Sequence, residues 1–366
     1  MIPFLDLTRQ HGPIEAELNR AMSDVLRSGQ YVMGHHGQSL AADLASYCGC
    51  THGIGVASGT DALRLTLQAM GVGPGDEVLT TPFTFIATVN TISRCGARPV
   101  FVDIEPSTFN IDPTKLQAAI TDKTKAIVVV HLFGHPAKMD QICNIAKQVS
   151  IPVIEDAAQA LGARWAGRPV GSFGEAACLS FFPTKNLGGV GDGGMVVTSS
   201  AELADGIDVL RRHGSRKRNI ADVIGFNSRL DELQATVLKV KLPFLDEWNR
   251  ERRLIASRYD ELLRYLPVHR PYVEPRATHV FHQYTIRVER HRDELRQHLQ
   301  KAGVPSMVYY PMAIHEQPPY RKDVQQPLVE AEHACRQVLS LPIFPGLQVE
   351  EQHQVVNAIK TFFAAP

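Results

Sequence analysis

The sequence has little of the features that mark several common classes of protein. Lys plus Arg and Asp plus Glu each total 38, so the formal net charge is zero and no basic excess indicates nucleic-acid binding. No apolar run approaches the length of a membrane-spanning helix. The first residues, MIPFLDLTRQ, are too few and too polar for a secretory signal. We therefore expect that the chain binds neither nucleic acid nor a membrane.

Cysteine is also scarce. Six cysteines in 366 residues do not make a disulfide framework, which favours a reducing cytoplasm as the location. Cys48 and Cys50 form a C-x-C pair, but no second pair has the spacing of zinc ligands, so we expect no metal.

The length predicts two domains, because 366 residues is long for one hydrophobic core. We assign residues 1–244 to a large ligand-binding domain and residues 245–366 to a smaller C-terminal α/β domain. Residues 231–265 are predicted to form a long helix, which Pro243 can kink, between the two.

Short apolar strands alternate with helical segments through the first half of the chain. Strands are expected at about residues 54–57, 77–80, 99–102, 126–131, 153–155 and 176–182. This alternation predicts an α/β fold with a parallel sheet that helices cover on both faces. Ligands of such sheets lie at the carboxyl ends of the strands. Ser58, Asp156 and Ser180 occupy such ends, so we expect them to face one site.

The segment SFFPTKNLGGVGDGG, residues 180–194, contains a single lysine, Lys185. It follows an apolar strand, and burial against apolar walls would lower its pKa and make its amine a nucleophile. The glycines allow the backbone to fold closely around a bulky group. We interpret Lys185 as a Schiff-base lysine. The alternative, a surface lysine after a strand, is the commoner case for such a segment taken alone.

Two further segments fit the same chemistry. At residues 54–70 a strand passes through SGTDAL into a helix, which predicts either a phosphate site at the helix N-terminus or a plain helix cap. Asp156 ends a buried strand, where a carboxylate needs a cationic partner. A protonated pyridine nitrogen would be such a partner and is the electron sink of pyridoxal phosphate. The alternative is an aspartate that caps the next helix.

Three side chains can complete this cofactor site. Gln159 can donate a hydrogen bond to the ring hydroxyl, and Ser180 can add a hydroxyl to the phosphate site. Phe85 can stack on the ring face, although a core phenylalanine is an equally good interpretation.

The order of these segments resembles the DegT/DnrJ group of pyridoxal-phosphate sugar aminotransferases, from residue 4 to about residue 344. The matching segments are SGTDAL at 58–63, GPGDEV at 73–78, TFIAT at 84–88, GARPVFVDI at 96–104, EDAAQALGA at 155–163, SFFPTKNLGGVGDGG at 180–194, RRHG at 211–214 and GFNSRLDELQA at 225–235. The resemblance implies the fold type I (aspartate aminotransferase-like) architecture, pyridoxal 5′-phosphate as cofactor and a homodimer with active sites at the subunit interface.

The resemblance also implies a role for each matching residue. Lys185 and Asp156 are the expected catalytic residues, Lys185 moving the proton and Asp156 pairing with the pyridine nitrogen. The cofactor-binding residues implied are Gly59, Thr60, Phe85, Asp156, Gln159, Ser180, Lys185 and, from the neighbouring subunit, Asn227. The substrate-binding residues implied are Tyr31, Arg229, Tyr310 and His315.

The implied reaction moves an amino group from L-glutamate to a nucleotide-linked keto sugar in amino-sugar or polysaccharide biosynthesis. The glycine-rich lysine segment resembles members that act on UDP-linked 3-keto sugars, and the 4-keto dTDP-sugar aminotransferases are the alternative. A non-catalytic regulatory protein that binds pyridoxal phosphate is a second alternative. A third, an NAD-dependent dehydrogenase, is disfavoured because GIGVASG at 53–59 lacks the G-x-G-x-x-G spacing.

The chain departs from the family pattern at two places. Leu40 and Ala41 replace a common aromatic-glutamate pair, and Ser228 replaces a common aromatic residue. We expect both departures to affect packing or substrate choice rather than catalysis.

Overall fold

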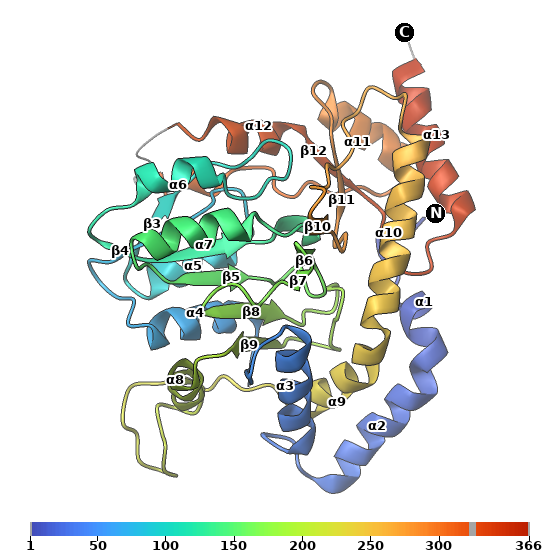
Figure 1. The fold of residues 1–366 in the computed structure, drawn as a ribbon. Helices are drawn as coiled ribbons and strands as arrows, with labels where there is room; N and C mark the ends of the chain where they lie inside the picture. The colour runs from blue at the N-terminus through green and yellow to red at the C-terminus, as the bar shows by residue number, and fades with distance from the viewer. Residues whose placement is uncertain (1, 322–326, 365–366) are drawn as a thin grey trace.

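A seven-stranded sheet forms the centre of the larger part of the molecule (Figure 1). The computed structural model describes residues 2–321 and 327–364. The strands lie in the order β1-β9-β8-β5-β4-β2-β3, and β9 runs antiparallel to its two neighbours. Their bounds are β1 His52–Val56, β2 Glu77–Thr80, β3 Arg98–Phe101, β4 Thr124–Val130, β5 Val153–Asp156, β8 Ala176–Ser180 and β9 Gly194–Thr198.

The predicted α/β fold with a mostly parallel sheet is confirmed, and β9 is the strand that runs against the others. The strands β8, β5, β4, β2 and β3 are parallel to one another. The strand β9 was not predicted, because its first residue belongs to a glycine-rich stretch and only a few apolar residues follow. Those residues, Met195 to Val197, are buried between β1 and β8.

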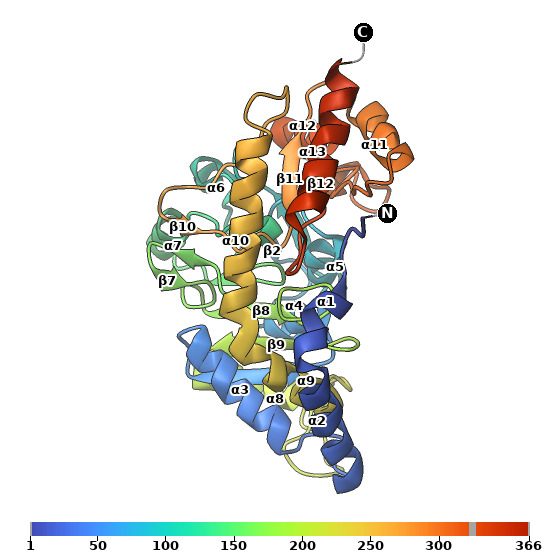
Figure 2. The same ribbon diagram turned by 90° about the vertical axis from the view of Figure 1, so that its right-hand side faces the viewer.

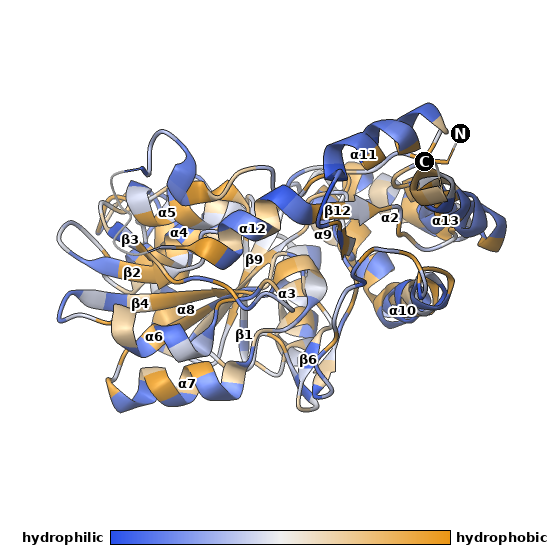
Figure 3. Cartoon of the chain, turned by 90° about the horizontal axis from the view of Figure 1, so that it is seen from above, coloured by the Kyte–Doolittle hydropathy of each residue, from blue (hydrophilic) through white to orange (hydrophobic). Residues whose placement is uncertain are grey.

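Helices cover both faces of this sheet, as expected. Successive residues of a strand point to opposite faces. In β4, Val128 belongs to the core under α4, α5 and α8, whereas Ile127 and Val129 belong to the core under α6 and α7. Figure 3 shows the strands largely in the hydrophobic colour. The helix bounds are α3 His35–Tyr47, α4 Gly59–Ala69, α5 Ile86–Arg94, α6 Pro113–Ala119, α7 Met139–Gln148, α8 Ala201–Arg211 and α9 Glu232–Lys241.

The long helix expected at residues 231–265 is interrupted at Pro243. A 3-10 turn, η3 (Leu242–Phe244), separates α9 from α10 (Leu245–Leu262). Proline lacks the N–H that a continuous helix would use, and the turn accommodates it. Figure 2 shows α10 running from the end that carries α3 and α9 to the end that carries α13.

The C-terminal part has its own core. Strands β11 and β12 pair antiparallel, and their buried side chains pack against α10, α11 and α13. Ile2 also joins this core. The division at residue 245 stays a prediction. The bounds are β11 Tyr284–Arg287, α11 Arg292–Lys301, α12 Val329–Gln337, β12 Val338–Leu341 and α13 Val349–Ala364.

Shorter elements complete the fold. A small sheet joins residues from both parts of the chain, in the order β10-β6-β7. A 3-10 turn, η1, leads directly into α2 near the start of the chain. The bounds are α1 Leu7–His11, η1 Gly12–Ile14, α2 Glu15–Ser28, η2 Leu132–Gly134, β6 Arg164–Trp165, β7 Arg168–Pro169, β10 Ala277–Thr278 and η4 Ile314–Glu316.

All six cysteines are unpaired, so the structure has no disulfide framework among them. Within residues 2–321 and 327–364, no helix is both long and apolar enough to cross a membrane. In the same part of the chain, no three His, Cys, Asp or Glu side chains are grouped so that they could hold a metal ion.

Candidate active site

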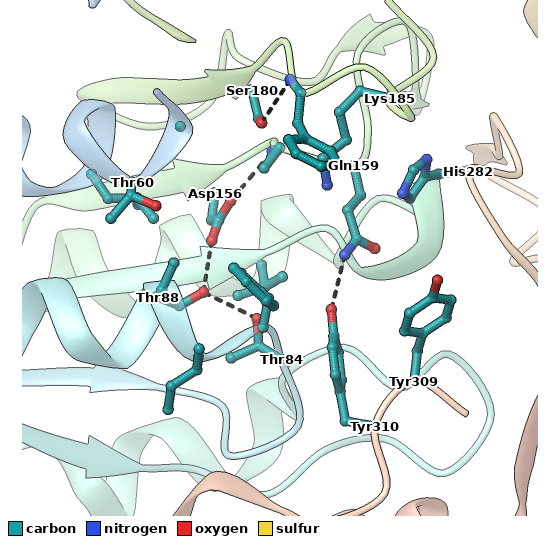
Figure 4. A pocket seen from close by; sticks show the side chains of 18 of the residues that line it. Thr60, Thr84, Thr88, Asp156, Gln159, Ser180, Lys185, His282, Tyr309 and Tyr310 are labelled. Atoms are coloured by element: carbon teal, nitrogen blue, oxygen red, sulfur yellow. Dashed lines mark hydrogen bonds between the residues drawn. The ribbon is translucent and has the colours of Figure 1, made fainter. Parts of the chain in front are cut away.

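A cavity of about 780 Å³ opens at the carboxyl ends of β1, β5 and β8 (Figure 4). The three side chains that the sequence places at these ends, Ser58, Asp156 and Ser180, all line it, which confirms that they face one site. The cavity is also lined by other residues predicted from the sequence, namely Gly59, Thr60, Phe85, Gln159, Lys185 and Tyr310.

Lys185 extends into this cavity from the turn that follows β8. Its backbone N–H donates to the carbonyl of Phe182 at 2.9 Å, which fixes the turn. Burial lowers the pKa of the Lys185 amine to about 8, and the negative charge of Asp156 opposes this shift in part. About a tenth of the amine is therefore neutral at pH 7, far more than for an ordinary lysine, as the nucleophile interpretation requires.

Asp156 is a buried carboxylate without an ion pair in the described part of the chain; its exposed fraction is 6%. The Thr88 hydroxyl donates to its Oδ2 at 2.8 Å, and the Ala158 N–H donates to its Oδ1 at 3.3 Å. Burial raises the pKa of Asp156, and these two hydrogen bonds oppose the rise. A cation in the cavity would remove this unfavourable term, so the site fits a protonated ring nitrogen.

The start of α4 forms one end of the cavity. The Ser58 Oγ caps the helix by accepting from the Asp61 N–H at 3.1 Å. Two glycines allow unusually close packing here. A Cβ on Gly59 would lie 2.7 Å from the Ser180 Cβ, and a Cβ on Gly194 would lie 2.4 Å from the Ser58 carbonyl. Helix N-terminal N–H groups beside serine and threonine hydroxyls form a site that fits a phosphate.

Gln159 and Tyr310 form the opposite wall. The Gln159 Oε1 accepts from the Phe133 N–H at 2.7 Å, and its Nε2 donates to the Tyr310 hydroxyl at 3.2 Å. The Phe85 ring lies near Tyr310, with 6.4 Å between the ring centroids, and 55% of Phe85 is exposed. An aromatic side chain this exposed at a cavity wall is available to stack on a ligand.

Four predicted site residues do not line the cavity of their own chain. Asn227 and Tyr31 are exposed, and Arg229 is half-buried. His315 is buried, packs near the Phe101 ring and has its Nε2 3.3 Å from Glu332 Oε1. Its geometry therefore does not support the expected contact of His315 with substrate.

Among the cavity-lining residues that sequence reasoning missed are three with polar side chains, Thr88, His282 and Tyr309. Thr88 belongs to the TFIAT segment, one of the segments that match the family. That match is the sequence signal that could have identified its hydroxyl as a partner of Asp156. His282 and Tyr309 come from the C-terminal part of the chain. No local pattern in the sequence connects either of them to the lysine segment.

The model of the DegT/DnrJ/EryC1/StrS aminotransferase family matches residues 13–360 of the chain. A relative from Geobacillus stearothermophilus called pleiotropic regulatory protein is 50% identical and covers 99% of this chain and 98% of its own. The UDP-N-acetyl-3-dehydro-alpha-D-glucosamine 3-aminotransferase of Acidithiobacillus ferrooxidans is 44% identical, with 98% and 97% covered. The dTDP-3-amino-3,4,6-trideoxy-alpha-D-glucose transaminase of Streptomyces venezuelae is 42% identical, with 98% and 95% covered.

Solved structures give the same result. The crystal structure of S. venezuelae DesV in complex with a ketimine intermediate has a TM-score of 0.97 and 42% identity, with 100% of this chain and 99% of that chain covered. The structure of NtdA from Bacillus subtilis with bound cofactor PMP has a TM-score of 0.92 and 33% identity, with 100% and 85% covered.

Proposed function

Because this chain belongs to the DegT/DnrJ/EryC1/StrS aminotransferase family, we propose that it moves the amino group of L-glutamate onto a UDP-linked 3-keto sugar. The chain is a pyridoxal-phosphate-dependent sugar-nucleotide aminotransferase of the fold type I architecture. The observation that carries the proposal is the meeting, in one cavity, of a lysine of lowered pKa and a buried carboxylate that forms no ion pair within the described residues.

The side chains present fit the cofactor. Asp156 would hold the ring nitrogen, and the start of α4 with Ser180 would hold the phosphate. Phe85 would cover the ring face and Gln159 would contact the ring hydroxyl. When bound, pyridoxal phosphate supplies an electron sink for the carbon that exchanges its amino group.

Lys185 and Asp156 have different roles in the reaction. With a pKa of about 8, Lys185 Nζ can both accept and return the proton that the transfer moves. Asp156 stays ionised beside a cation, and its orientation is fixed by the hydroxyl of Thr88 and the N–H of Ala158. Asp156 is buried and Lys185 is half-buried, and the low dielectric around them strengthens their electrostatic interaction.

Amination at C3 is supported by two relatives with different nucleotides. The A. ferrooxidans relative is named for a UDP-linked substrate and the S. venezuelae relative for a dTDP-linked product, and both names place the amino group at C3. This favours the 3-keto proposal over the 4-keto alternative. We propose UDP as the nucleotide because the A. ferrooxidans relative, at 44% identity against 42% for the S. venezuelae relative, is named for a UDP-linked substrate.

The name of the G. stearothermophilus relative raises the alternative of a regulatory protein. A purely regulatory role would need neither an amine of lowered pKa nor a carboxylate to hold the ring nitrogen. This chain has both in one cavity. We therefore propose catalysis rather than sensing alone.

We further propose a homodimer in which Asn227 of the neighbouring subunit completes the phosphate site. Asn227 is exposed, and the segment before it carries Val223 and Ile224, with exposed fractions of 51% and 92%. At the cavity, Phe85 and Phe182 are also exposed, by 55% and 49%. Exposed apolar side chains of this kind are typical of surfaces that bind another chain.

The unpaired cysteines support the predicted cytoplasmic location.

The test is a panel of UDP- and dTDP-linked 3-keto and 4-keto sugars incubated with glutamate and the purified protein. Mass spectrometry detects the change from ketone to amine. We expect amination of a UDP-linked 3-keto sugar by the natural chain and none by Lys185→Ala. Preference for a 4-keto sugar, or amination by the Lys185→Ala variant, would contradict the proposal.

A further inference from the structure

His282 is a buried histidine of the cavity wall to which neither the fold nor the proposed chemistry assigns a role. It precedes β11, has an exposed fraction of 6% and lines the cavity. Figure 4 shows its ring on the side of the cavity that also carries Lys185, Gln159 and Tyr309.

Buried amides behind the ring fix which nitrogen carries its proton. Asn249 donates through Nδ2 to the Leu161 carbonyl at 3.1 Å, so its Oδ1 is the acceptor for Asn186 Nδ2 at 2.7 Å. Asn186 Nδ2 also donates to the Val280 carbonyl at 3.0 Å. The amide of Asn186 is thus oriented with its Oδ1 toward the His282 Nδ1, 3.2 Å away.

An amide oxygen accepts hydrogen bonds and cannot donate them. The His282 Nδ1 must therefore carry the proton, and Nε2 is left with a lone pair. Within the described residues, Nε2 has no hydrogen-bond partner and is not among the fully buried polar atoms. A ligand in the cavity can therefore reach this acceptor.

The ring stays neutral in this setting. Burial holds the pKa of His282 well below the ordinary value of 6.5, and the positive charges of Lys185 and Arg252 lower it further. A neutral ring with Nδ1–H committed to Asn186 presents a fixed acceptor to the cavity at neutral pH.

We propose that His282 is a positioning residue that accepts a hydrogen bond, through Nε2, from the substituent next to the ketone of the bound sugar. This inference rests on the proposed function and specifies how the sugar is recognised. An acceptor beside the reacting centre selects a hydroxyl or amide N–H donor on the sugar. It disfavours the carboxylates of glutamate, which have no proton to donate. His282 therefore acts in the sugar half-reaction and not in the glutamate half-reaction.

Two substitutions test separately the roles of Nδ1, which faces Asn186, and Nε2, which faces the cavity. In His282→Asn the amide N–H₂ can still donate to Asn186, but nothing reaches the cavity as an acceptor. In His282→Gln the longer side chain can place an acceptor at the position of Nε2, at the expense of the buried link. The probes are UDP-N-acetyl-3-dehydro-glucosamine and its analogues with hydrogen in place of the 4-hydroxyl or of the 2-acetamido group.

We expect the natural chain to prefer the full sugar over at least one analogue by about tenfold in kcat/KM, the size expected for one hydrogen bond. His282→Asn should lose this preference. Its melting temperature should be unchanged, and the rate of its glutamate half-reaction should stay within twofold of that of the natural chain. His282→Gln should recover part of the preference.

Three results would overturn the inference: no preference by the natural chain, a preference kept by His282→Asn, or an equal loss in both half-reactions. The last would indicate a contact with the transferred amine instead. Failure of the natural chain to aminate the full sugar at all would count against the proposed function, and is thereby distinguished from failure of the inference.

Discussion

Two ionisable side chains, the buried Asp156 and the half-buried Lys185, set the chemistry at the scale of single residues. Burial makes the amine of Lys185 a weaker base and the carboxyl of Asp156 a weaker acid. Each shift is unfavourable for the charged form in the protein alone. A ligand that brings a cation to Asp156 and uses the neutral amine of Lys185 compensates both. The site is therefore adapted to its cofactor before the cofactor binds.

The rate at which the apoprotein takes up pyridoxal phosphate should depend on pH through Lys185. The pKa of its amine is lowered from 10.5 to about 8, so the neutral, reactive fraction rises as the pH increases through 8. Stopped-flow absorbance of uptake should therefore show a rate that increases with pH and levels off above about 9.

Asp156→Asn is the control for this profile. The charge of Asp156 raises the pKa of Lys185, so its removal should shift the midpoint to lower pH. A midpoint near 10.5, the value of an ordinary lysine, would contradict the assignment of Lys185 as the reacting group.

At the scale of elements, the start of α4 and the loop after β8 form the phosphate end. Close approach depends on Gly59 and Gly194, which pack against Ser180 and Ser58. Ser228 supports the same region, since its buried Oγ donates to Asp61 Oδ2 at 2.7 Å and accepts from the Ala57 N–H at 3.2 Å. An aromatic residue at position 228 could not make these two bonds.

Gly59→Ala should weaken cofactor binding far more than it weakens the fold. The added methyl would lie 2.7 Å from the Ser180 Cβ, so Ser180 and the start of α4 must move apart. We expect the dissociation constant for pyridoxal phosphate to rise about tenfold or more.

Gly73→Ala is the matched control, because a Cβ there meets nothing within 4 Å. Titration of both apoproteins by absorbance measures the difference. Equal affinities for the two variants would show that close packing at residue 59 does not shape the phosphate site.

The elements differ in how well the sequence predicted them. Strands such as β4 were predictable because their apolar residues are continuous and bounded by turns. The strand β12 was missed because its apolar residues continue the pattern of α12, which ends at Gln337. Local motifs located Lys185, Asp156 and the start of α4. His282 could not be located in this way, since only the contacts of its segment with Phe133 and Asn186, distant in the sequence, bring it to the cavity.

At the scale of the whole molecule, α10 joins the two cores and the cavity draws on both parts of the chain (Figure 2). Lys185 comes from the large sheet, whereas His282 and Tyr310 come from the C-terminal part. The proposed dimer adds Asn227 from a neighbour. Each complete site would then need residues from two chains.

Mixed dimers should test this sharing of residues. Lys185→Ala removes the amine, and Asn227→Asp places a negative charge where the proposed phosphate site has an amide. Both variants alone should lose nearly all activity. Co-expressed, they should recover about a quarter of the natural activity, because about half of the dimers are mixed and each mixed dimer has one intact site.

Size-exclusion chromatography on the same preparation provides the control. If mixed dimers form and no activity returns, Asn227 does not act across the interface. A monomeric and active natural chain would exclude the proposed dimer altogether.

The most direct measurement is the identity of the lysine that carries the cofactor. Lys241 is an internal control, because burial lowers the pKa of its amine to about 8 as well. Unlike Lys185, it does not line the cavity; it is fully buried and donates to the Gly188 carbonyl at 2.7 Å. Borohydride reduction of the holoprotein, proteolysis and mass spectrometry should place the phosphopyridoxyl group on Lys185. Its presence on Lys241 or any other lysine, or on no lysine, would contradict the account.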